Sequence, residues 1–343
     1  MRVATIQSTA QQQAQDGSRD ARRLRNGLIG TVVLVVLLLG IGLAVPDLRG
    51  VLNRVAHAGI GWLALAVALE VASCLGYVAV MRLILNRGPA REVRRLAWAE
   101  MAFGAVVPVG GAGSLAIGAW AMRAWGIAWS RIANRSAVIF LLTSGVNATV
   151  LGLAGVGLLA GLGYKSTGFV YGLLPAAIAF GLLAAFVALP RVPVTRETRL
   201  ARWVRDAEKV AFTPNIRLLG ALGYLLFDIA VLWACLRAVG VSAPIMALVV
   251  GYQIGYLANL VPIPGGIGAL EGGLLAALVL FGLPAAPTAA AVVLYHAVAL
   301  WVPTLGGTYG FARLRGSLAS RRRAQLQAVP TPAPVPAVRG LAA

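Results

Sequence analysis

Residues 259–273 read Asn-Leu-Val-Pro-Ile-Pro-Gly-Gly-Ile-Gly-Ala-Leu-Glu-Gly-Gly and interrupt an apolar stretch that runs from about residue 244 to 281. Proline removes a backbone donor and clashes with the preceding turn, so no straight helix passes Pro262 and Pro264. In hydrocarbon each unpaired backbone group costs several kcal/mol, so such a break is tolerated only where protein buries it or water reaches it. The flanking segments are each about 18 residues, the minimum for a span. A re-entrant helix pair and an ordinary hairpin of two spanning helices both stay open.

The composition is that of a helical membrane protein. The 343 residues are 59% hydrophobic and 12% charged, with a mean hydropathy of +0.82, whereas soluble domains are about half apolar and a quarter charged. The net charge of +19 gathers in short segments between apolar runs, as orientation signals do, which argues against nucleic-acid binding. Cys74 and Cys235 lie far apart without a metal-site spacing. We therefore expect no disulfide framework, metal or other cofactor.

We predict an all-α polytopic fold with a polar N-terminal tail (1–26), a transmembrane domain (27–312) and a basic, Pro/Ala-rich tail (313–343) that is disordered. The domain has halves at about 60–189 and 217–312, joined by residues 190–216, and residues 46–59 form a short polar connection. Spanning helices are expected at 28–45, 60–85, 136–162, 169–189, 217–239 and 287–310.

A second break resembles the first. Residues 107–113 read Val-Pro-Val-Gly-Gly-Ala-Gly, between short apolar segments at 96–107 and 114–125. A Val-Pro pair followed by three glycines thus occurs in each half, and Gly126 and Gly282 follow the two copies. If each broken helix pair is re-entrant and returns to the side of the membrane from which it enters, the first pair enters from the inside of the cell and the second from the outside. Broken segments at matching positions of two inverted repeats are the sequence sign of a central transport site.

The basic residues predict the orientation. With this topology one side of the membrane receives all but Arg49, Arg54, Lys165 and Arg237 of the 30 lysines and arginines. That side is therefore cytoplasmic and holds both termini. If each broken segment were instead a hairpin of two spanning helices, the basic connections would still lie on the same side of the membrane. The charges therefore do not distinguish such hairpins from re-entrant pairs.

The segment 190–216 contains an amphipathic helix. Apolar side chains from Leu200 to Val210, including Trp203, Val204 and Ala207, share one face, while arginines occupy the others. One interpretation is a helix that lies in the membrane interface on anionic lipid. The other is a solvated linker helix between the two halves.

Four of the eleven acids, Glu70, Glu100, Asp228 and Glu271, lie within apolar segments. An ionisable residue in the membrane is costly, so each is a candidate for function. Glu70 and Asp228 have an alternative role in hydrogen bonds between helices, to a nearby Ser or Asn. Glu271 comes three residues after the glycine break, in the expected first turn of a helix, where it either binds substrate or only caps that helix.

Residues 260–271, Gly282 and the segment Leu294-Tyr-His-Ala-Val-Ala-Leu-Trp-Val-Pro-Thr-Leu-Gly306 resemble the lysylphosphatidylglycerol synthase transmembrane-region family. The resemblance spans roughly residues 27–312 and includes the Pro-Gly-Gly-x-Gly-x-x-Glu signature. It implies a bacterial plasma-membrane protein, since relatives include the flippase domain of the multiple peptide resistance factor, which moves aminoacylated phospholipid between leaflets. Two features depart from the family: His296 stands where relatives more often carry Arg, and we expect no aminoacyl-transferase domain like that of the two-part enzymes.

Three functions stay open: a lipid translocator, a secondary transporter of a small organic anion, and a scaffold for a cell-envelope enzyme. No catalytic motif appears, so we expect no enzyme activity. The expected partners are membrane phospholipids, preferably anionic, and the sequence leaves open a homodimer or an enzyme partner. The candidate substrate-binding residues are Glu271, Gly265, Gly266, Gly268, Asn259, His296, Tyr295, Asp228, Glu100, Gly110, Gly111, Arg123 and Arg135.

Overall fold

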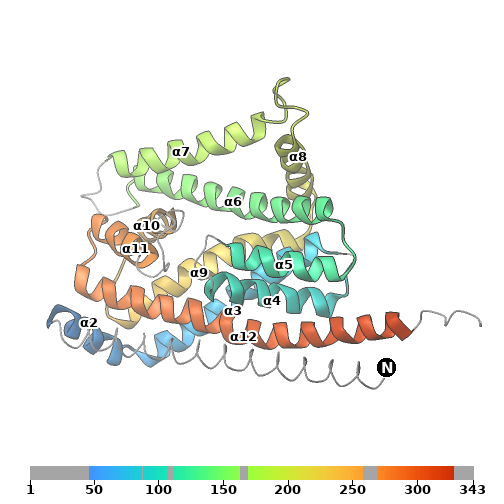
Figure 1. Cartoon of the computed structure of the whole chain (residues 1–343). Helices are drawn as coiled ribbons and strands as arrows, with labels where there is room; N and C mark the ends of the chain where they lie inside the picture. Colours follow the sequence, from blue (N-terminus) through green and yellow to red (C-terminus); the bar gives the residue numbers. More distant parts are fainter. Residues whose placement is uncertain (1–45, 87, 107–110, 163–168, 258–268, 328–343) are drawn as a thin grey trace, which may run out of the picture. The chain divides into compact units, whose positions relative to one another are not determined.

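The computed structural model describes residues 46–86, 88–106, 111–162, 169–257 and 269–327, and every regular element in these ranges is a helix, as predicted (Figure 1). The chain divides into two units, residues 1–57 and 58–343. The elements are α2 (Pro46–Ala56), α3 (Ile60–Ile84), α4 (Ala90–Val106), α5 (Ala112–Ala124), α6 (Trp129–Leu159), α7 (Phe169–Ala188), α8 (Arg199–Phe212), the 3-10 helix η1 (Ile216–Leu218), α9 (Leu219–Ala238), α10 (Ile245–Leu257), α11 (Ala269–Leu280) and α12 (Ala285–Gln327).

Helix α2 belongs to the first unit and occupies most of the segment for which the sequence predicts a polar connection. The His57 ring follows its last turn and is hydrogen-bonded through Nδ1 to the Asn53 carbonyl at 2.8 Å. The spanning helix predicted at 28–45 lies outside the described residues. All further elements belong to the second unit.

Five helical segments among the described residues are long and apolar enough to cross a membrane: α3, α6, α7, η1 with α9, and α12 up to Arg321. They coincide with the five predicted spans that the structure describes. Large apolar side chains on α6 and α7, such as Phe140, Leu153 and Leu182, are more than half exposed, at 67%, 60% and 61%. Apolar surface on this scale is unfavourable in water and is typical of helices that face lipid.

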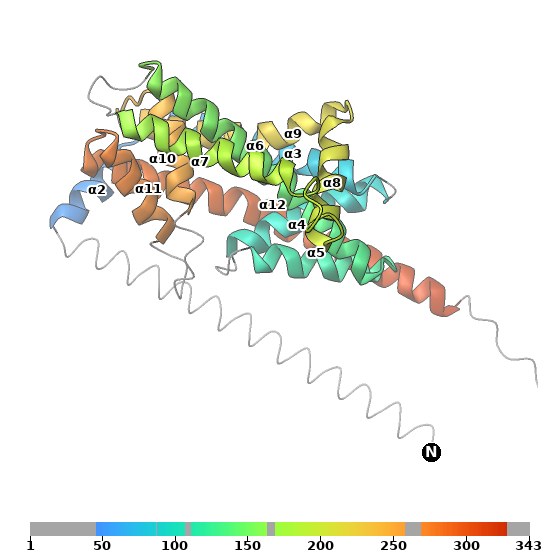
Figure 2. The same ribbon diagram turned by 90° about the horizontal axis from the view of Figure 1, so that it is seen from above.

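Two pairs of shorter helices adjoin the predicted breaks. Helices α4 and α5 have 17 and 13 residues, and α10 and α11 have 13 and 12. At 1.5 Å per residue each is shorter than a hydrocarbon core of about 30 Å. The α4–α5 pair opens toward the end of the unit where α12 finishes, and the α10–α11 pair toward the end where α12 begins (Figures 1 and 2). The breaks themselves, 107–110 and 258–268, lie outside the described residues.

Small residues allow the central helices to approach closely. A Cβ at Gly76 of α3 would lie 2.6 Å from the Gly220 carbonyl of α9, so no larger residue fits without a shift of the helices. Likewise, a Cβ at Gly307 of α12 would collide with Ala102 and the Trp98 carbonyl of α4. Lipid supplies no hydrophobic force between helices, so this close contact is what stabilises their association.

Helix α12 corrects the prediction of a disordered tail from residue 313. It continues without interruption to Gln327, because its later turns have their own partners on the second unit. Leu314 and Leu318, one turn apart, are buried in a core that α3, α4 and α12 share, and Arg321 forms an ion pair with Glu92 of α4 at 2.9 Å.

Helix α8 lies across the ends of α6 and α7 (Figure 1). Its N-cap is Thr198, whose hydroxyl accepts a hydrogen bond from the Ala201 amide at 3.1 Å. The predicted apolar face exists, but Val204 and Ala207 pack with Val138 of α6. The centre of the face expected to enter lipid is therefore covered by protein.

Candidate functional site

The carboxylate of Asp228, on α9, is at the centre of a buried polar cluster. The Tyr252 hydroxyl of α10 donates to its Oδ2, and the Tyr295 hydroxyl of α12 donates to Oδ1 at 3.1 Å. Only 9% of Asp228 is exposed, and a buried carboxylate is stable only with such donors. One acid thus connects three helices. The sequence pointed to Ser or Asn as alternative partners for this residue, whereas the observed donors are tyrosines.

Glu70, on α3, is a second buried acid beside the first. Its Oε1 accepts a weak hydrogen bond from the Cys74 thiol at 3.7 Å, and its Oε2 has no hydrogen-bond partner within the described part of the chain. Glu70 is close enough to Asp228 for their charges to interact. Two carboxylates in a low dielectric repel each other, so a cationic group beside this pair would be favourable.

Glu100, on α4, extends the cluster toward the first helix pair. The Tyr77 hydroxyl donates to its Oε2 at 2.7 Å, and the Tyr77 ring lies 5.4 Å from that of Tyr224 on α9. The side chain of Glu100 packs against Gly118 of α5, where a Cβ would collide with its carboxylate. Tyr77 therefore connects Glu100 of α4 with Tyr224 of α9, the helix that also carries Asp228.

Glu271 forms a separate pair with His296. It occupies the first turn of α11, as predicted, and its Oε1 lies 2.7 Å from His296 Nδ1 of α12, with the two side chains 22% and 39% exposed. His296 directly follows Tyr295, so two consecutive residues of α12 contact different acids: Tyr295 contacts Asp228, and His296 contacts Glu271. The carboxylate and the imidazole are therefore partly exposed where α11 and α12 meet.

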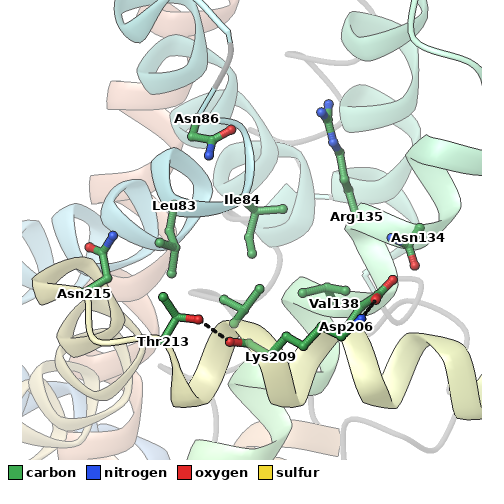
Figure 3. A pocket seen from close by; sticks show the side chains of 11 residues that line it. Leu83, Ile84, Asn86, Asn134, Arg135, Val138, Asp206, Lys209, Thr213 and Asn215 are labelled. Atoms are coloured by element: carbon green, nitrogen blue, oxygen red, sulfur yellow. Dashed lines mark hydrogen bonds and ion pairs between the residues drawn. The ribbon is translucent and has the colours of Figure 1, made fainter.

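At the end where α8 lies, apolar, amide and charged side chains line a pocket of about 500 Å³ (Figure 3). Arg135 of α6 and Lys209 of α8 line it. Arg123 does not line this pocket. Its guanidinium donates to the Ile127 carbonyl at 3.0 Å and stacks over the Trp129 ring. A second hollow of about 870 Å³ lies near the start of α8, and its basic lining residues are Arg191, Arg196, Arg202 and Arg205.

Comparison with known proteins identifies the family of this chain. The family model described as the lysylphosphatidylglycerol synthase TM region matches residues 27–307. The chain belongs to this family. As a family member with five apolar helices of spanning length among the described residues, it is a multi-pass membrane protein. A UPF0104 membrane protein from Methanothermobacter thermautotrophicus is 38% identical over 88 residues, which is 25% of this chain and 25% of that relative.

For this family member, the structure brings some predicted residues together and separates others. Asp228 contacts Tyr295, and Glu271 contacts His296. Gly111 precedes α5 with φ of +78°, a left-handed conformation that favours glycine. The remaining predicted positions lie outside the described residues: Gly110, Asn259, Gly265, Gly266 and Gly268.

Two of the tyrosines that hold the acids, Tyr77 and Tyr252, were not predicted from the sequence. Tyr77 and Tyr252 occur in two different apolar helices, α3 and α10, where a hydroxyl usually needs a hydrogen-bond partner. Their presence in apolar segments indicates, from the sequence alone, that each hydroxyl has a hydrogen-bond partner in another helix. It would not have identified which acid each tyrosine meets.

Proposed function

We propose that this protein moves a phospholipid, anionic or aminoacylated, between the leaflets of a bacterial plasma membrane, and that it does so as a transporter without a catalytic step. The observation that carries the proposal is the Glu271–His296 pair, partly exposed at the first turn of a short helix inside an apolar bundle. A lipid headgroup is the polar species that has to cross such a bundle. Membership of a family named for a lipid synthase supports lipid as the cargo.

In this proposal, Glu271 binds the cationic amine of a headgroup, and His296 orients the carboxylate. The buried acids Glu70, Asp228 and Glu100 provide a polar interior beside it. Keeping three buried acids in apolar helices costs several kcal/mol each. A scaffold would gain nothing from them, which favours transport over scaffolding.

We further propose that the α4–α5 and α10–α11 pairs are re-entrant and related by inverted symmetry. Their short lengths and their openings toward opposite ends of the unit support this arrangement (Figure 1). The end with α8 would face the cytoplasm, because the connections there carry most of the basic residues.

Single cysteines at Ala112 and Ile267 test re-entry, in a background without Cys74 and Cys235. If the pairs end near the membrane midplane, small aqueous thiol reagents should label both positions, while large impermeant reagents should label neither. Labelling of both positions by large reagents from outside would show two ordinary hairpins.

Transport itself is tested in proteoliposomes that contain fluorescent phosphatidylglycerol, lysyl-phosphatidylglycerol or phosphatidylethanolamine. A membrane-impermeant quencher reports how much label remains in the inner leaflet. We expect movement of at least one of these lipids above that in protein-free liposomes. No movement across the panel, combined with uptake of a soluble organic anion, would favour the secondary transporter instead.

A further inference from the structure

The pocket of about 500 Å³ is formed by the end of α3, the start of α6, the last turns of α8 and Asn215 before η1 (Figure 3). Its lining has two chemical parts. Ile84, Val138 and Val210 provide an apolar wall, and Arg135, Lys209 and Asp206 bring two positive charges and one negative charge. Side-chain amides, among them that of Asn134, add neutral donors and acceptors. A ligand that fits this lining is itself partly apolar and carries charges of both signs.

The position of the pocket indicates where such a ligand comes from. Helix α8 lies across the ends of α6 and α7 (Figure 1), and both of those helices are long and apolar enough to span a membrane. The pocket is therefore near the level where the spans leave hydrocarbon. Phospholipid headgroups occupy this level, and the apolar wall fits the glycerol region of a lipid better than it fits free phosphate.

The charged side chains match a zwitterion. Arginine presents a fork of donors that suits the two free oxygens of a phosphodiester, and Lys209 adds a second cation. Asp206 Oδ1 lies 3.7 Å from Lys209 Nζ, with the side chains 42% and 76% exposed. An exposed pair of this kind is weak, so the Asp206 carboxylate can accept a primary ammonium in place of Lys209.

We propose that this pocket binds the headgroup of an aminophospholipid, with the phosphodiester at Arg135 and the ammonium at Asp206. The inference rests on the proposed function for its role as the site where lipid is loaded from the leaflet. Binding itself needs no translocation. The two claims can therefore fail separately.

Native mass spectrometry of the full chain in detergent, titrated with phosphatidylethanolamine, phosphatidylglycerol or inorganic phosphate, measures this binding. Arg135→Gln should weaken phosphatidylethanolamine binding about tenfold or more, since hydrogen bonds to charged groups are strong. Arg131→Gln is the matched control, because Arg131 is an exposed arginine on the same helix that does not line the pocket. Lys209→Gln, at a 76% exposed side chain, should weaken binding less, without risk to the fold.

Asp206→Asn tests the ammonium contact. It should remove the preference for phosphatidylethanolamine over phosphatidylglycerol that we expect of the wild type. Unchanged lipid binding by Arg135→Gln and Lys209→Gln, or displacement of the lipid by equimolar inorganic phosphate, would overturn the assignment. Loss of binding in Arg135→Gln with transport intact would confirm the pocket and disprove its loading role, whereas binding by a protein that moves no lipid would contradict only the proposed function.

Discussion

The replacement Glu271→Gln separates a transport role of Glu271 from a structural one. Glutamine has the same shape and keeps an oxygen that can accept the hydrogen bond from His296, while the negative charge is lost. The Oε1–Nδ1 distance is 2.7 Å and the side chains are 22% and 39% exposed. A hydrogen bond to a charged group contributes about 1.5–3 kcal/mol and a neutral one about 1 kcal/mol. With partial exposure the stability lost should be about 1 kcal/mol or less.

Transport should fall much further than stability. If the carboxylate binds a cationic headgroup inside the bundle, the neutral amide removes the main attraction. A tenfold lower rate corresponds to about 1.4 kcal/mol of barrier, so we expect a decrease of at least tenfold. Lipid movement in proteoliposomes and thermal unfolding in detergent, measured on the same preparation, provide the comparison.

Glu208→Gln is the matched control. Glu208 also forms an ion pair at 2.9 Å, with Arg191, and its side chain is 20% exposed, but it lies on α8. This variant should transport normally. If Glu271 and His296 act as a unit, adding His296→Gln to Glu271→Gln should cause little further loss. Wild-type transport by Glu271→Gln would refute the site assignment and leave Glu271 a structural role only.

Three replacements test the packing around the site by thermal unfolding. Tyr252→Phe removes one of the hydrogen-bond donors to Asp228 and should destabilise the fold by about 1–3 kcal/mol; an unchanged unfolding temperature would show that the hydrogen bond contributes nothing. Gly76→Ala places a methyl group against α9 and should cost about 1–3 kcal/mol, while Gly61→Ala, in the same helix with no neighbour within 4 Å, should be neutral; equal effects would contradict close α3–α9 packing. Val204→Ala, at a fully buried position of α8, should cost about 1–2 kcal/mol, and a neutral result would mean that α8 is not docked.

The spanning helices could be predicted because length and apolarity alone determine whether a segment crosses a membrane. Five predicted spans have a counterpart in the structure. The first turn of α11 was also predictable, since prolines and glycines before residue 269 end one helix and Glu271 suits the start of the next.

The buried cluster could not be predicted in the same way. Asp228 meets Tyr252 and Tyr295, which are 24 and 67 positions further along the chain. No periodicity relates these residues, because their contact depends on how far α10 and α12 slide and rotate against α9. The sequence shows the tyrosines and the acid, but the relative shift and rotation of the three helices cannot be read from it.

The C-terminal end of α12 is a different kind of failure, because its signal was present in the sequence. Leu314 and Leu318 are spaced by one helical turn among arginines, a pattern typical of an amphipathic helix. In the structure these leucines are buried and Arg321 pairs with Glu92. Apolar residues spaced by one helical turn within a basic segment therefore predict that the preceding spanning helix continues through that segment.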